Sequence, residues 1–108
     1  MTSVDVLGTT YEIKYSDDTQ DSNLKNAEGY CNLITKTIVI DTFKNSSDYA
    51  EDEIEKQQKI VLRHEITHAF LYESGLDTQS WGVNEEIVDW IALQSAKLFD
   101  VFNKAKAI

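Results

Sequence analysis

The fold is decided by residues 54–72, which read IEKQQKIVLRHEITHAFLY. Apolar residues recur in this stretch every three to four positions, as they do along one face of an α-helix. Ser47 and Asp48, which precede it, are residue types that cap helix N-termini, and Gly75 can adopt the left-handed conformation that ends helices. The pattern therefore predicts a long helix over residues 48–75.

A second helix is predicted over residues 83–106, beginning near Asn84. Its apolar stripe also follows helical spacing and contains Ile87, Val88, Ile91, Ala92, Leu98, Phe99 and Phe102. The C-terminal half of the chain is thus predicted to consist of two helices.

Residues 1–45 are predicted to form a β-rich part, in which residues 4–15 show the period of two that is typical of strands. Around Gly8, polar residues alternate with Val4, Val6, Tyr11, Ile13 and Tyr15, which predicts two short strands joined by a turn. Residues 16–28 are polar and read as a loop, and residues 30–41 predict a hairpin that turns near Thr35 and Lys36. We expect residues 37–40 to form an edge strand.

The order of strands first and helices second favours the α+β class. We therefore predict one domain over residues 1–108, in which a small, mostly antiparallel sheet is followed by the two helices. With 42% apolar residues the chain has enough material for a core.

The charge and cysteine content restrict the partners. The chain has 10 Lys and Arg against 19 Asp and Glu, a formal charge of −9, which disfavours nucleic acid and anionic membranes as partners. No apolar run approaches the ~20 residues of a membrane helix. The single cysteine, Cys31, fits a reducing compartment, and the N-terminus has no signal-like stretch. We expect a cytoplasmic monomer.

The chain's two histidines lie in one pentapeptide, His64-Glu65-Ile66-Thr67-His68. Positions four apart share a helix face, so both imidazoles can reach one ion. In this HExxH arrangement the two histidines bind Zn²⁺ and the glutamate acts as general base. The alternative is a pair of half-buried histidines that only make ordinary hydrogen bonds.

A catalytic zinc site needs a third protein ligand, which must be a carboxylate or Cys31 because no third histidine exists. Glu85 and Asp89 lie at the start of the second helix, four positions apart. One of them can bind the metal while the other orients a ligand imidazole through its second ring nitrogen. Alternatively, Glu85 and Glu86 only stabilise the helix N-terminus through its dipole.

Together these motifs resemble those of the gluzincin metallopeptidases, typified by thermolysin, whose glutamate helix carries an Asn-Glu-x-x-Ser-Asp signature. Val88 stands in place of that serine. The resemblance covers about residues 53–102 and implies a zincin-like fold with Glu65 as general base. It further implies His64, His68 and Glu85 as zinc ligands, with Glu86 as the fallback ligand, and Asp89 and Asn84 as supporting residues around them.

At this size the chain is also similar to the ImmA/IrrE-type metallopeptidase domains of bacteria and their mobile elements. That resemblance implies cleavage of a repressor, so the expected substrate is a peptide or an intracellular protein such as a basic regulator. Thermolysin-like enzymes supply a further histidine that stabilises the tetrahedral intermediate, and none remains here. Tyr72 is the candidate replacement, with Tyr30 and Tyr49 also considered, although each can equally be a packing residue.

Two other functions stay open. The chain can be a regulatory or binding module of zincin fold that keeps its zinc without physiological turnover, or a metal-free structural domain. Partner binding that survives Glu65→Gln would favour the binding module, and a stoichiometric zinc measurement would exclude the metal-free domain.

Overall fold

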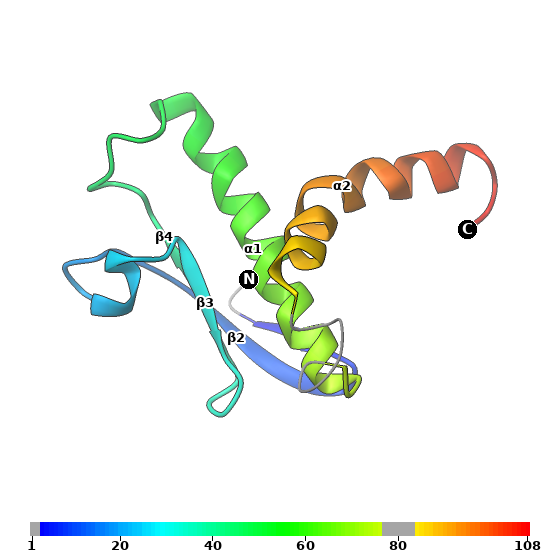
Figure 1. Ribbon diagram of the computed structural model, residues 1–108, viewed down its shortest axis with the longest axis horizontal. Helices are drawn as coiled ribbons and strands as arrows, with labels where there is room; N and C mark the ends of the chain where they lie inside the picture. Colours follow the sequence, from blue (N-terminus) through cyan, green and yellow to red (C-terminus); the bar gives the residue numbers. More distant parts are fainter. Residues whose placement is uncertain (1–2, 77–83) are drawn as a thin grey trace.

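A computed structural model describes residues 3–76 and 84–108. Within these residues a four-stranded sheet comes first and two helices follow, so the predicted α+β class is confirmed (Figure 1). The strands are β1 (Ser3–Val6), β2 (Thr9–Ser16), β3 (Gly29–Asn32) and β4 (Thr37–Asp41). A short 3-10 helix, η1 (Ser22–Lys25), lies in the polar segment, and the helices are α1 (Glu51–Glu73) and α2 (Glu85–Lys104).

Both predicted hairpins are present. β1 and β2 pair antiparallel through a turn at Leu7 and Gly8, whose φ angles are 52° and 93°. Positive φ at both central residues is what a type I′ turn requires, and this turn matches the twist of the flanking strands. β3 and β4 also pair antiparallel, and Lys36, with φ 57°, leads into β4.

The strand order is β1-β2-β4-β3, in which β2 and β4 run parallel. β4 is therefore an inner strand, and the expectation that residues 37–40 form a sheet edge was wrong. The reason lies in its composition, because Ile38, Val39 and Ile40 are all buried, as in a strand covered on both faces. The edge strands are β1 and β3.

Helix α1 packs on one face of the sheet. Its Val61 and Ala69 share a core cluster with strand residues that include Tyr11, Ile38 and Ile40. The start of β3 approaches α1 so closely that a Cβ atom on Gly29 would lie 2.7 Å from Cγ1 of Val61. Glycine at this position therefore allows the edge strand to lie directly beside the helix.

The N-terminus of α1 lies three residues later than predicted, at Glu51. Neither Ser47 nor Asp48 caps the helix, because both lie before its N-cap position, and the backbone N–H of Asp48 donates to the Ser46 hydroxyl in the preceding loop. The N-cap is Ala50, whose N–H donates to the Glu53 carboxylate. At the other end Gly75 has φ 87° and its N–H donates to the Tyr72 carbonyl, which stops the helix where the sequence predicts.

Helix α2 is capped by Asn84, whose side-chain oxygen accepts the N–H of Glu86 at 2.8 Å. The first residue of its predicted range, 83, lies outside the described residues. Val88 and Ala92 are buried, and the Ala92 carbonyl accepts a hydrogen bond from Arg63 of α1. The second half of α2 extends away from α1 and the sheet (Figure 1). Neither described helix combines the length and apolar character that crossing a membrane requires.

Candidate metal centre

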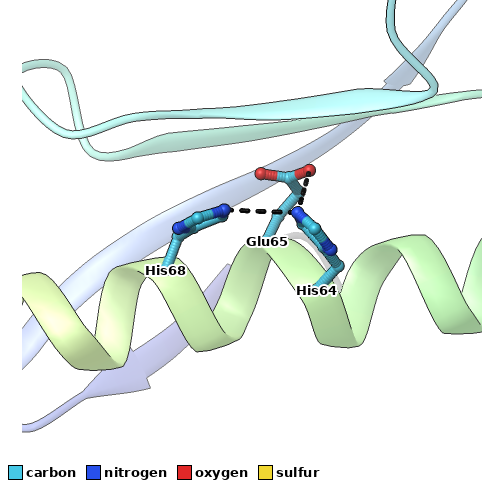
Figure 2. A group of neighbouring side chains, drawn as sticks. All are labelled: His64, Glu65 and His68. Carbon is cyan, nitrogen blue, oxygen red and sulfur yellow. Dashed lines mark hydrogen bonds and ion pairs between the residues drawn. The ribbon is translucent and has the colours of Figure 1, made fainter. Parts of the chain in front are cut away.

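The two histidines lie one helical turn apart on α1 and face the same side. Figure 2 shows His64, Glu65 and His68 projecting from α1 toward the strands. The Nε2 atoms of the two imidazoles are 3.2 Å apart, and the ring centroids are 4.9 Å apart. The spacing of the pentapeptide thus brings two metal-binding nitrogens together, as the helical geometry requires.

Helix α2 adds carboxylates to this pair. One oxygen of Glu85 lies 2.8 Å from Nε2 of His68, and the other lies 3.3 Å from Nε2 of His64. Asp89, one turn further on, places Oδ1 2.8 Å from Nδ1 of His64. Glu86 makes no such contact within the described residues, so the structure places Glu85, and not the fallback residue, against both histidines.

The contact with Asp89 determines how His64 presents its nitrogens. Because a carboxylate can only accept, this contact favours the neutral tautomer of His64 in which Nδ1 carries the proton. The lone pair of Nε2 then faces His68 and Glu85, which is the tautomer that a metal ligand needs. Asn84 supports this arrangement indirectly by capping the helix on which Glu85 and Asp89 lie.

Glu65 is the one acidic residue of the site that is buried, with 6% of its surface exposed. Burial raises the pKa of Glu65 to about 7, the nearby Glu85 and Asp89 carboxylates also raise it, and His64 acts in the opposite direction. A carboxyl group with a pKa near neutrality can both accept and release a proton at physiological pH.

The side chains of His64, Glu65 and His68 can hold a metal ion, because each offers a ligand atom within 4.8 Å of the others. Glu85 brings its oxygens closer to the two Nε2 atoms than Glu65, whose nearer oxygen is 4.0 Å from His64. Among residues 3–76 and 84–108 no lysine or arginine forms an ion pair with the carboxylates of Glu65, Glu85 and Asp89. Their negative charge therefore exceeds the positive charge around them, and a divalent cation would balance it.

The site lies where two surface hollows meet, since both are lined by Gly29, His64 and Glu65. One hollow, of about 300 Å³, continues past His68 and Glu85 to Cys31 and Leu33 of the β3–β4 hairpin. Cys31, the other ligand considered, thus lines the same hollow as Glu85. The second hollow, of about 400 Å³, follows α1 toward its N-terminus as far as Gln57. Together the hollows leave the site open to a ligand from both directions.

The tyrosines considered as hydrogen-bond donors are engaged elsewhere. Tyr30 donates its hydroxyl to the Asp21 carboxylate, and Tyr49 donates to Glu28 at 2.5 Å. The ring of Tyr72 lies beside the Lys36 ammonium, 4.7 Å from its centroid. The role assigned to Tyr72 remains a prediction without a supporting contact in the described residues.

A second polar cluster on α1 was not predicted from the sequence. The Glu73 carboxylate accepts hydrogen bonds from the hydroxyls of Tyr11 (2.6 Å) and Thr9 (3.1 Å) and from the Lys36 ammonium (3.0 Å). We call these four residues the Glu73 cluster. No local pattern indicates it, because the partners of Glu73 lie 37 to 64 positions away in the chain.

Comparison with protein families places this chain. It belongs to a family described as peptidases of plants and bacteria, whose model matches residues 11–107. No curated protein and no solved structure matches the chain. Family membership supports peptidase activity in general and agrees with the class of reaction expected from the pentapeptide.

Proposed function

We propose that this member of the peptidase family is a zinc-dependent metallopeptidase of the gluzincin type. His64, His68 and Glu85 hold the zinc ion, and Glu65 is the general base. The observation that carries the proposal is the convergence of donors from two helices, because Nε2 of His64 lies 3.2 Å from Nε2 of His68 and 3.3 Å from a Glu85 oxygen.

These two distances match those between zinc ligands, and the third side of the donor triangle, from Nε2 of His68 to Glu85, is shorter at 2.8 Å. Tetrahedral zinc with bonds of about 2.0–2.1 Å holds its ligand atoms about 3.3 Å apart. Two imidazole nitrogens and one carboxylate also form a donor set of catalytic zinc sites, which leave one position for water or substrate. A carboxylate 2.8 Å from the second ring nitrogen of a ligand histidine, as Asp89 is from Nδ1 of His64, is the usual support of such a ligand and strengthens the assignment.

When bound, zinc would polarise the scissile carbonyl and make a water molecule more acidic. Glu65 accepts a proton from the attacking water and later delivers it to the leaving amine. Its buried position supports this role, because a carboxyl group shielded from bulk water exchanges its proton with groups inside the hollow.

The proposed substrate is a peptide or an intracellular protein, such as a basic regulator. The chain itself is proposed to act as a monomer in the cytoplasm. β3 borders the hollow at the site, and its outer edge has no strand partner in the described residues. An extended peptide can hydrogen-bond to such an edge whatever its sequence. The formal charge of −9 would steer basic partners toward the chain.

The test is reconstitution. The purified chain is stripped of metal with a chelator, reloaded with one equivalent of zinc and incubated with a mixture of peptides, and the products are identified by mass spectrometry. We expect cleavage only in the zinc-loaded sample, and none by Glu65→Gln loaded with the same amount of zinc. Equal cleavage by the stripped and reloaded samples would refute the proposal.

One observation favours a second function, a zinc-binding module without turnover. Two of the three tyrosines considered for the oxyanion already donate their hydroxyls to carboxylates, and both histidines belong to the metal pair. In that case the wild-type chain and Glu65→Gln would bind a partner peptide equally tightly, and neither would cleave it.

A further inference from the structure

The hollow of about 400 Å³ beside the candidate metal centre has apolar walls. They are formed by residues from the segment before β3, from α1 and from α2, namely Ala27, Ile60, Val61, Ala92 and Leu93. His64, Glu65 and Asp89 line the end next to the metal centre, and Glu28 and Gln57 line the other part. A side chain that enters from the metal centre therefore passes apolar surface before it meets Glu28.

The Glu28 carboxylate is held in place by two neutral donors. One oxygen accepts the side-chain amide of Gln57 at 2.8 Å, and the other accepts the Tyr49 hydroxyl at 2.5 Å. That hydrogen bond raises the pKa of Tyr49 to about 12. No lysine or arginine among residues 3–76 and 84–108 forms an ion pair with Glu28, and its oxygens have further lone pairs to offer.

The dimensions suit a long side chain. Gln57, which contacts Glu28, precedes His64 by seven residues on α1, and a helix advances about 10 Å over seven residues. Lysine and arginine combine an apolar stem with a cationic end, so they can lie along the apolar walls and direct their charge toward the carboxylate. An acidic side chain would be repelled by both Glu28 and Asp89.

We propose that this hollow is the subsite for a lysine or arginine side chain close to the scissile bond, and that Glu28 is the residue that determines this specificity. The proposal rests on the proposed peptidase function, because it names the substrate class of the same site. Recognition then depends on the single carboxylate of Glu28, which lines the hollow beside the metal centre, and not on the overall negative charge of the chain.

The first experiment measures specificity in turnover. After the cleaved bond has been located in a peptide mixture, two peptides are made that differ only in carrying lysine or norleucine at the position enriched in basic residues. We expect the wild-type chain to prefer lysine in kcat/KM by about tenfold or more, the range of a charge-assisted hydrogen bond. Glu28→Gln should bring the lysine-to-norleucine ratio close to one.

The matched control is Glu55→Gln, which removes the same charge from an exposed position of α1 that pairs with Lys59. This variant should keep the wild-type ratio. Products without enrichment of lysine or arginine at any position, or a ratio that Glu28→Gln leaves unchanged, would overturn the proposal. Because the wild-type product profile is informative alone, a Glu28 variant that fails to fold does not remove the test.

The second experiment separates this proposal from the proposed function. Two further peptides, which need no knowledge of a cleaved bond, carry a fluorophore and differ only in lysine or norleucine at one central position, and their binding is measured on zinc-loaded Glu65→Gln and on the double variant Glu28→Gln/Glu65→Gln. Tighter binding of the lysine peptide that disappears in the double variant supports the subsite even if the wild-type chain cleaves nothing. Equal binding of both peptides to Glu65→Gln overturns the subsite even if the wild-type chain is an active peptidase.

Discussion

Helix α1 carries two clusters of polar side chains that differ in how their charge is balanced. In the Glu73 cluster the carboxylate meets an ammonium and two hydroxyls, so every strong acceptor has a donor from the protein. The histidine cluster, which comprises His64, Glu65, His68, Glu85 and Asp89, brings three carboxylates to two imidazoles.

This difference separates a structural role from a binding role. A buried polar network that satisfies itself contributes to a unique fold. A cluster with excess negative charge is stable only if it binds a cation, takes up protons or stays exposed to water. Glu85 and Asp89 remain about 60% exposed at their side chains, so the histidine cluster is accessible, whereas the Glu73 side chain is 15% exposed. Variants of the histidine cluster should therefore change metal binding, whereas variants of the Glu73 cluster should change stability and leave metal binding intact.

The largest effect is expected from His68→Ala. It removes one of the three proposed ligands, so the purified variant should contain no stoichiometric zinc and should show no peptide cleavage. Metal analysis after dialysis and a cleavage assay measure both properties. One zinc ion per chain in this variant would show that the histidine cluster is not the metal site.

Glu65→Gln should reduce kcat by about a thousandfold, within the range attributed to general bases, while leaving zinc bound. The amide has nearly the same shape as the carboxyl group but cannot accept the proton of water. Steady-state kinetics and metal analysis on the same preparation separate the two effects. Turnover close to that of the wild-type chain would contradict the assignment of Glu65 as the base.

Asp89→Asn should weaken zinc binding by about 10- to 100-fold, as is typical for the loss of a residue that orients a ligand histidine. The amide can still contact Nδ1 of His64, so the cleavage rate at saturating zinc should fall less than in Glu65→Gln. Competition with a chromogenic chelator measures the affinity. An unchanged affinity would mean that the 2.8 Å contact does not support the metal ligand.

In the Glu73 cluster, Tyr11→Phe should lower the free energy of unfolding by about 1.5–3 kcal/mol, the scale of one hydrogen bond to a charged group. Tyr11 is fully buried and its ring stays in the core, so the change removes the hydroxyl alone. Urea unfolding of metal-free protein measures the loss. Zinc affinity should not change, and a tenfold loss of it would show that the two clusters are coupled.

The smallest effect concerns pH. Hydrogen bonds from Tyr11 and Lys36 hold the pKa of Glu73 below its ordinary value of 4.5. A carboxyl pKa that is lower in the folded state contributes stability above the ordinary pKa, and this contribution is lost as the pH falls through the lowered value. The difference in unfolding midpoint between the metal-free wild-type chain and Glu73→Gln should therefore shrink below pH 4.5. A difference that grows toward acid would have the wrong sign for this cluster.

Sequence reasoning predicted the features that depend on near neighbours. The alternation around Gly8 predicted the first hairpin, Gly75 predicted the end of α1, and the spacing of His64 and His68 placed both imidazoles on one face. It misplaced the start of α1, because whether a capping residue acts depends on the loop before the helix, where Ser46 accepts the N–H of Asp48.

The same reasoning could list Glu85, Glu86 and Asp89 as acidic candidates, but their distances to the histidines depend on how α2 crosses α1. The contacts of Glu28 could not be predicted either, because its partners Tyr49 and Gln57 lie 21 and 29 positions away in the chain. Contacts of this range follow no sequence period.

By itself the sequence determined the order of strands and helices, the α+β class and the pairing of two histidines with one glutamate. These features depend on periods of two and of three to four residues, and such periods are properties of the local backbone. Only the tertiary structure decided that β4 is an inner strand, that Glu85 and Asp89 meet different nitrogens of the histidine pair, and that Glu73 is satisfied by Lys36. The physical reason is that α1 packs between the sheet and α2. This packing brings together side chains that are far apart along the chain, and no local sequence period predicts such contacts.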